Sequence, residues 1–174
     1  MKTAYNTEYE KNPNAILIST SSGVLPCKRI FFVKWQPDKD DAKLRQSLVD
    51  LIWNVIQNVM AYKFTSLAFP AIGCGKYACS VNIVVKTLVR EMKNQLSTRD
   101  LQLTVKFVIQ ADQQHIYDEF CKQVLATQQG ISIYFLLIFF SLVWKFDLSE
   151  YETFNEFCDF YVIQSIFCIR LKKI

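Results

Sequence analysis

The sequence is poor in the residues that build metal sites and membrane spans. It has one histidine, His115, and six cysteines that form no Cys-x-x-Cys pair, so the paired ligand spacing of a zinc site is missing. The most apolar run, residues 131–144, is fourteen residues long, whereas a helix needs about 20 to cross a bilayer. The first fifteen residues are polar and charged, which is unlike a signal peptide. We therefore expect no metal site, and reduced thiols in an intracellular protein.

Charge is also scarce and evenly spread. The 20 basic and 16 acidic residues leave a net charge of +4. When the chain is divided at Gly130, neither part contains a strongly basic block. A specific nucleic-acid interface needs a clustered basic patch. We expect no specific nucleic-acid partner, although a weakly basic chain is compatible with a small anionic ligand.

The middle of the chain alternates between predicted strands and predicted helices. Short apolar runs predict strands, and apolar residues at helical spacing predict helices. The order is strand 15–18, strand 29–35, helix 40–62, strand 65–69, helix 81–96, strand 101–110 and helix 112–128. This alternation predicts an α/β fold whose helices cover a mixed or largely parallel sheet.

Two segments flank this core of residues 15–128. Residues 1–14 are polar and predict a disordered or loosely packed lead-in. Residues 129–174 form a hydrophobic, aromatic-rich tail that begins with an abrupt change of composition at Gly130. The tail is compatible with an interfacial membrane segment, with packing against the sheet, or with a tail that has no selected function. The third alternative is favoured because its apolar residues have no regular spacing.

Glycine is rare, and its placement is informative. Of four glycines, Gly73 and Gly75 lie between the strand at 65–69 and the helix at 81–96, which Ser80 is placed to cap. Glycine lets the backbone approach a ligand closely, and the N-terminus of a helix favours an anion. The spacing is equally compatible with a tight turn that binds nothing.

Two motifs in the correct order carry a family resemblance. The run TSLAFPAIGCG at 65–75 closely resembles the second phosphate loop of macrodomains, which typically reads SIAFPAIGTG, and the run GVLPCKRI at 23–30 resembles their G-x-L-P-C-K-x-V segment. Macrodomains bind ADP-ribose. The resemblance covers residues 15–128 and is strongest to the macrodomains of multi-macrodomain mono-ADP-ribosyltransferases.

The resemblance implies a three-layer α/β/α module that holds ADP-ribose at the C-terminal ends of its strands. Its diphosphate loop would consist of Gly73, Cys74, Gly75, Lys76, Tyr77 and Ala78. Backbone N–H groups of residues 73–77 would surround the diphosphate, and Tyr77 would lie near the distal ribose. It also implies ADP-ribose or mono-ADP-ribosylated proteins as partners, no cofactor beyond that ligand, and a location in nucleus and cytoplasm.

The sequence departs from the family pattern at two places. Ala78 stands where the family has a third glycine, which is a mild change if φ is negative there. The N-terminal portion of the family, with its adenine-binding aspartate, its Asn-Ala-Ala-Asn-like run and its first glycine loop, has no counterpart before Ala15. We therefore expect an N-terminally incomplete module, a reader with weakened binding.

The sequence supports no catalytic residue. No carboxylate adjoins the glycine loop, and His115 lies on the last helix of the core, so hydrolysis of ADP-ribose linkages has no visible site. Cys74 and Cys79 lie near a helix N-terminus, which lowers a thiol pKa, but no histidine stands near them as a base. A dinucleotide oxidoreductase is excluded because the next strand ends at Gln110, 32 residues after Ala78, rather than about 20. A ligand-free scaffold or interaction module, and a fragment of a larger ADP-ribosyltransferase, remain as alternatives.

Overall fold

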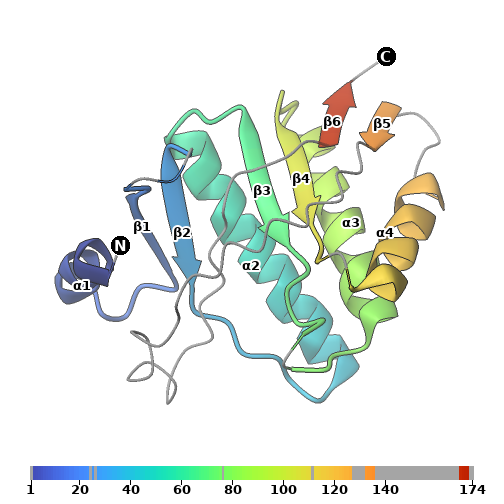
Figure 1. Cartoon of the computed structure of the whole chain (residues 1–174), viewed down its shortest axis with the longest axis horizontal. Coiled ribbons are helices and arrows are strands. Elements are labelled where there is room, and N and C mark those ends of the chain that lie inside the picture. The colour runs from blue at the N-terminus through green and yellow to red at the C-terminus, as the bar shows by residue number, and fades with distance from the viewer. Residues whose placement is uncertain are drawn as a thin grey trace.

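The computed structural model describes residues 2–23, 25, 27–75, 77–110 and 112–126, together with the backbone of 132–135 and 169–172. Within these ranges the helices are α1 (Lys2–Lys11), α2 (Asp41–Ala61), α3 (Val81–Thr98) and α4 (Gln114–Ala126). The strands are β1 (Leu17–Ser21), β2 (Arg29–Val33), β3 (Ser66–Pro70), β4 (Thr104–Val108), β5 (Ser132–Phe135) and β6 (Ile169–Lys172). The predicted α/β class is confirmed (Figure 1).

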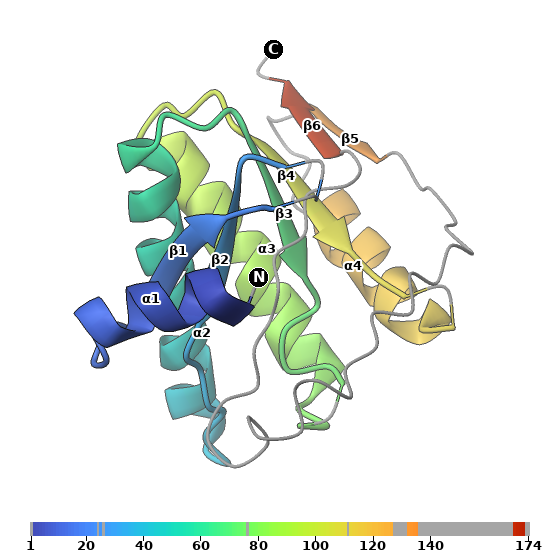
Figure 2. The same cartoon turned by 60° about the vertical axis from the view of Figure 1, so that its left-hand side comes forward.

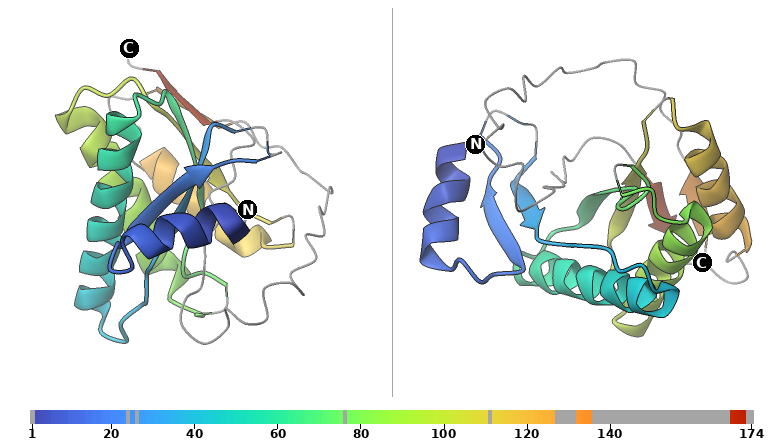
Figure 3. Two further views of the ribbon diagram at one scale, coloured as in Figure 1. Left: turned by 90° about the vertical axis from the view of Figure 1, so that its left-hand side faces the viewer. Right: turned by 90° about the horizontal axis from the view of Figure 1, so that it is seen from below.

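The centre of the fold is the unit β2–α2–β3–α3–β4. The three strands point the same way, and α2 and α3 lie together on one face of them (Figure 1). Helix α4 packs against α3 (Figure 3). Because the strands run in one direction, their C-terminal ends meet at one edge, where α/β proteins place their ligands.

The strands form separate pairs. β1 and β2 are antiparallel, β3 and β4 are parallel, and β5 and β6 are antiparallel. In the described residues no ladder joins β2 to β3, and Figure 1 and the right-hand view of Figure 3 show the two strands apart. In the described residues, the mixed or largely parallel sheet that the sequence predicted is therefore divided, and two of its parts, β1–β2 and β3–β4, share one helical layer.

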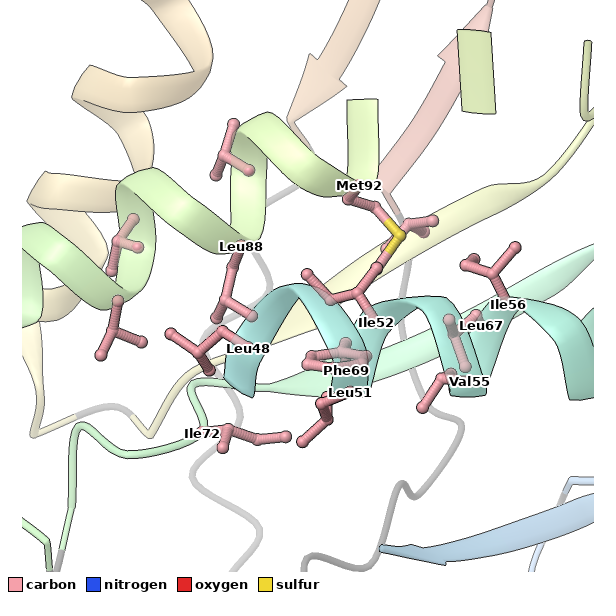
Figure 4. Packing of buried hydrophobic residues seen from close by; sticks show 14 of the residues in the cluster. Leu48, Leu51, Ile52, Val55, Ile56, Leu67, Phe69, Ile72, Leu88 and Met92 are labelled. Carbon is pink, nitrogen blue, oxygen red and sulfur yellow. The ribbon is translucent and has the colours of Figure 1, made fainter. Parts of the chain in front are cut away.

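The hydrophobic core lies between α2, α3 and the strands. The apolar residues at helical spacing on which the prediction of helix 40–62 rests are buried in α2: Leu44, Leu48, Leu51, Ile52, Val55, Ile56 and Val59. They pack against Leu88 and Met92 of α3 and against Phe69 of β3 (Figure 4). Burial of a side chain of this size stabilises the fold by about 1.5–3 kcal/mol, so this helix holds both halves of the sheet in place.

The N-terminal segment differs from the loose lead-in that the sequence suggested. Residues 2–11 form α1, which packs on β1 (Figure 3). Tyr5 is buried; its ring centroid lies 5.0 Å from that of Phe32 and 5.8 Å from that of Tyr9. Tyrosines four residues apart share one helix face, and contact with Phe32 orders a segment whose own composition is polar.

The first strand lies later in the chain than predicted. Residues 19–21, expected in a loop, belong to β1 because Thr20 pairs with Ile30 and Ser21 with Arg29. Thr20 is buried, and its hydroxyl donates to the Ser21 carbonyl oxygen at 3.1 Å. Pairing with β2 thus overrides the loop propensity of the serine-rich stretch.

Most of the tail, including residues 136–168, lies outside the described residues, and so do the three hypotheses for its role. Its described parts, β5 and β6, pair with each other, and β6 lies beside β4 (Figure 2). Among the helices that the structure describes, none has the length and apolar character of a membrane span.

Candidate functional site

The glycine loop runs from the C-terminal end of β3 to the start of α3. It is held by its own backbone: the Cys74 N–H donates to the Ala71 oxygen at 3.2 Å, the Ala78 N–H to Gly75 at 2.9 Å, and the Cys79 N–H to Gly73 at 3.0 Å. These bonds give the loop a defined shape. They also occupy the amides of Cys74 and Ala78, two of the predicted diphosphate-loop residues.

Gly73 occupies a position that only glycine fits. Its φ is +81°, in the left-handed region. A Cβ at this position would lie 3.0 Å from Cη2 of Trp35 and 3.4 Å from Sγ of Cys79. Both the backbone angle and the lack of space therefore require glycine at position 73.

Trp35, which the sequence analysis did not single out, supports the loop from β2. Its Nε1–H donates to the Ser47 hydroxyl at 3.1 Å, and that hydroxyl donates to the Leu44 carbonyl oxygen at 2.9 Å. The Tyr77 ring meets the Trp35 ring edge-on, with centroids 5.9 Å apart. The loop is thus fixed to α2 through one indole ring, at the edge where β2 and β3 both end.

Gly75 is exposed, and a Cβ built on it meets no atom within 4 Å. Within the described part of the chain, the Gly75 N–H has no hydrogen-bond acceptor. This residue therefore leaves both space and a backbone donor at the surface of the loop.

The N-terminus of α3 follows directly. Ser80 stands at the N-cap position, but its side chain makes no capping hydrogen bond, contrary to its expected role. Its carbonyl oxygen accepts from the Val84 N–H at 3.0 Å. The first N–H groups of a helix need partners from outside it, and Ser80 does not supply one.

Ala78 also has a left-handed backbone, with φ of +47°. The sequence analysis treated its replacement of a glycine as mild if φ were negative, and that condition is not met. An L-residue with a Cβ in this region costs about 1–2 kcal/mol. Position 78 therefore carries strain that a glycine would not have.

The two cysteines of the loop are protonated at neutral pH. Burial, with a smaller contribution from neighbouring Cys79, raises the pKa of Cys74 from 9.0 to about 12. Burial likewise raises the pKa of Cys79. Since the thiolate is the reactive form, neither cysteine is prepared to act as a nucleophile.

The remaining predicted residues lie apart from this centre or outside it. Lys76 is outside the described residues. His115 is exposed on α4. In the ranges described above, no three histidine, cysteine or carboxylate side chains gather where a metal could bind. The structure thus brings together Gly73, Gly75 and Tyr77 with Trp35, at the start of α3.

Comparison with known proteins concerns the family and the fold. A family model described as Macro domain matches residues 2–88, half of the chain. Among solved structures, the chain resembles an asparagine-to-alanine mutant of the Oceanobacillus iheyensis macrodomain, with a TM-score of 0.62 and 20% identity. That match covers 72% of this chain and 65% of the other, and at this identity it shows the fold alone. No curated protein matches the sequence.

Proposed function

The chain belongs to the macrodomain family, and from this premise we propose that it is an ADP-ribose-binding module, a reader of ADP-ribose or of mono-ADP-ribosylated proteins. Macrodomains generally bind ADP-ribose. The binding element proposed for this chain is the loop of residues 73–78, with the diphosphate at the N-terminus of α3. The multi-macrodomain transferase type, and a location in nucleus and cytoplasm, remain proposals from the sequence resemblance.

The observation that carries the proposal is the pairing of an open Gly75 with a helix start that Ser80 does not cap. The Gly75 amide has no acceptor among the described residues, and a side chain would find empty space there. The helix dipole places about half a positive charge at this end of α3. A diphosphate supplies the acceptor oxygens and the negative charge that this geometry lacks.

Tyr77 supports the sugar end of the ligand. It is partly buried, and its edge-on contact with Trp35 fixes its ring. A tyrosine presents an apolar face to a ribose and a hydroxyl to its edge. Tyr77 is therefore proposed to lie against the distal ribose.

We expect the binding to be weak. The amides of Cys74 and Ala78 already donate within the loop, so these two contacts with the diphosphate would require the loop to change. In the sequence resemblance, the adenine-binding aspartate and the first glycine loop of the family are not recognised before Ala15, and we propose on that basis that the site holds the diphosphate and the distal ribose.

Calorimetric titration of ADP-ribose into the whole chain tests the assignment. Three variants at Gly75 separate the effect of side-chain size on binding from that of charge. Gly75→Ala adds little bulk, Gly75→Gln adds length, and Gly75→Glu adds about the same length with a negative charge. We expect Gly75→Ala to bind like the parent chain and Gly75→Glu to bind at least about tenfold more weakly than Gly75→Gln, because only the carboxylate repels the diphosphate. Equal affinity of the glutamine and glutamate variants would contradict the loop assignment.

A second candidate, an interaction module that binds no nucleotide, is supported by the split sheet. An open sheet edge is a surface for another chain. If ADP-ribose gives neither heat nor a thermal shift with the parent chain, this candidate takes the place of the reader.

A further inference from the structure

The backbone of β2 directs half of its polar groups away from β1. The Lys34 N–H donates to the Ile16 oxygen at 2.8 Å, and the register pairs Ile18 with Phe32 and Thr20 with Ile30. In an antiparallel pair, bonded and non-bonded positions alternate. The N–H and C=O groups of Phe31 and Val33 therefore point to the side where β3 lies.

The backbone of β3 directs the complementary set away from β4. The Thr104 N–H donates to the Thr65 oxygen at 2.9 Å, and Thr104 lies opposite Ser66. With this register in a parallel pair, the N–H and C=O groups of residues 65, 67 and 69 are the ones that point toward β4. The groups of Ser66 and Ala68 therefore point toward β2.

Three of these residues are buried, so water does not readily replace the missing ladder. Phe31 is 3% exposed, Val33 is 1% exposed and Ala68 is 2% exposed. In the part of the chain that is described, no hydrogen bond is formed between β2 and β3. Buried backbone groups are paired in more than about 90% of cases. The facing edges of β2 and β3 therefore leave a position for a strand between them, with backbone groups on both sides that are unpaired within the described residues.

One helical layer packs against both edges. Phe31, Val33 and Ala68 belong to the same buried cluster as the inner face of α2, and the strands stand apart above that helix in Figures 1 and 3. Both edges are five residues long. A strand between them would gain ladder hydrogen bonds on both sides, whereas a strand added to an ordinary edge gains one ladder.

We propose that β2 and β3 together bind an extended, uncharged, apolar segment of a separate polypeptide, about five residues long, as a strand between them. The facing residues Phe31, Val33, Ser66 and Ala68 carry no charge. A strand with neighbours on both sides and a helical layer on one face is typically a continuous apolar run. The segment is thus a β-branched or aliphatic stretch, and its recognition does not depend on ADP-ribose.

A second copy of the chain fits this position less well than a separate polypeptide. Each described strand already has one ladder partner, so donating it would break a pair. The two open edges also face each other across α2, which leaves no outward edge for a symmetric contact between copies.

Amide hydrogen exchange of the whole chain tests the open edges without any substitution. We expect the amides of Phe31, Val33, Ser66 and Ala68 to exchange at least tenfold faster than those of Leu67 and Phe69, which donate to β4. Uniform protection along β3 at every protein concentration would show that the edges are already paired and would overturn the proposal. Protection that rises with protein concentration would assign the position to a second copy, which also overturns it.

The probe for the occupant is a synthetic peptide of alternating valine and isoleucine with one lysine at each end. Its binding should protect the four open-edge amides and leave Leu67 and Phe69 unchanged. Two control peptides carry N-methyl groups on one or the other set of alternate residues, so that each loses its donors to one side. We expect both to bind at least tenfold more weakly, because both edges are used. If N-methylation of only one set of residues weakens binding, the peptide adds to a single edge. If neither set weakens it, the peptide does not bind as a strand. Either result contradicts the proposal.

Discussion

We expect three exchanges between glycine and alanine in the glycine loop to have different effects on stability. Gly73→Ala places a Cβ at φ of +81° and 3.0 Å from Cη2 of Trp35. The left-handed backbone costs about 1–2 kcal/mol, and the overpacking costs about 1–3 kcal/mol. The indole cannot turn away without losing its bond to Ser47. We expect a loss of about 2–5 kcal/mol in the free energy of unfolding.

Gly75→Ala is the matched control. Gly75 does not have a left-handed backbone, and its Cβ would meet no atom within 4 Å. Replacing glycine where alanine fits reduces the entropy of the unfolded chain and stabilises by about 0.4–1 kcal/mol. The same chemical change two residues away should therefore leave stability unchanged or slightly higher.

Ala78→Gly should act in the opposite direction to Gly73→Ala. It removes the left-handed strain at φ of +47°, which raises the free energy of unfolding by about 1–2 kcal/mol. It also gives the unfolded chain more conformational freedom, which lowers the free energy of unfolding by about 0.4–1 kcal/mol. The net result is a gain of about 0.5–1 kcal/mol.

Urea denaturation followed by tryptophan fluorescence measures all three variants. With a slope of about 1–3 kcal/mol per molar, a loss of about 2–5 kcal/mol moves the midpoint by about 0.7 M or more. Equal midpoints for Gly73→Ala and Gly75→Ala would refute the loop geometry, and so would a destabilised Ala78→Gly.

Further predictions concern the support of the loop, its thiols, the core and catalysis. Trp35→Phe keeps an aromatic ring but removes the donor to Ser47, so it should lose about 1 kcal/mol in denaturation; an unchanged midpoint would show that this bond contributes nothing. Cys74, with its pKa raised to about 12, should react with iodoacetamide at pH 8 at least tenfold more slowly than a cysteine peptide, and faster as pH rises toward 12; equal rates at pH 8 would contradict its burial. Leu48→Ala, at a fully buried position, should lose about 2–5 kcal/mol, and a loss below 1 kcal/mol would contradict the packing of α2. Incubation with a mono-ADP-ribosylated protein should release no more ADP-ribose than a control without the chain, and turnover above that control would overturn the reader proposal.

Strong local patterns allowed the core to be predicted from the sequence. The seven apolar residues of α2 recur at helical spacing, and each is buried where the pattern placed it. Asp40 caps this helix, accepting from the amides of Ala42 and Lys43 at 2.9 Å, and the cap likewise involves only near neighbours in the sequence. Both features depend on residues near each other in the chain, which is why periodicity reveals them.

Features that depend on distant residues were not predictable in this way. Helix α1 has a polar composition, and it is ordered through Tyr5 against Phe32, a contact between separate elements. Whether β2 and β3 pair depends on how the strands assemble, so the sequence of either strand alone does not predict that the ladder between them is missing in the described residues.

The loop shows the same division. The positions of Gly73 and Gly75 between a strand and a helix were compatible with an anion site or with a tight turn that binds nothing. By contrast, the backbone angle of Ala78 and the missing side-chain cap at Ser80 are set by the way the loop folds on itself. An aromatic residue at the end of a strand is usually part of a core, so Trp35 was not singled out. Its place at the C-terminal end of the predicted strand 29–35, where α/β proteins bind ligands, was the signal that could have identified it.

The central claim is that an ADP-ribose diphosphate binds at Gly75 and the start of α3. Its most direct test is a titration of the isotope-labelled whole chain with ADP-ribose, followed through the backbone amide resonances. The account predicts that the amides of Gly75 and Val81 shift most, in proportion to occupancy, while that of His115 on α4 stays in place. Saturable shifts elsewhere with Gly75 and Val81 unmoved, or no shift at any amide up to millimolar ligand, would contradict it.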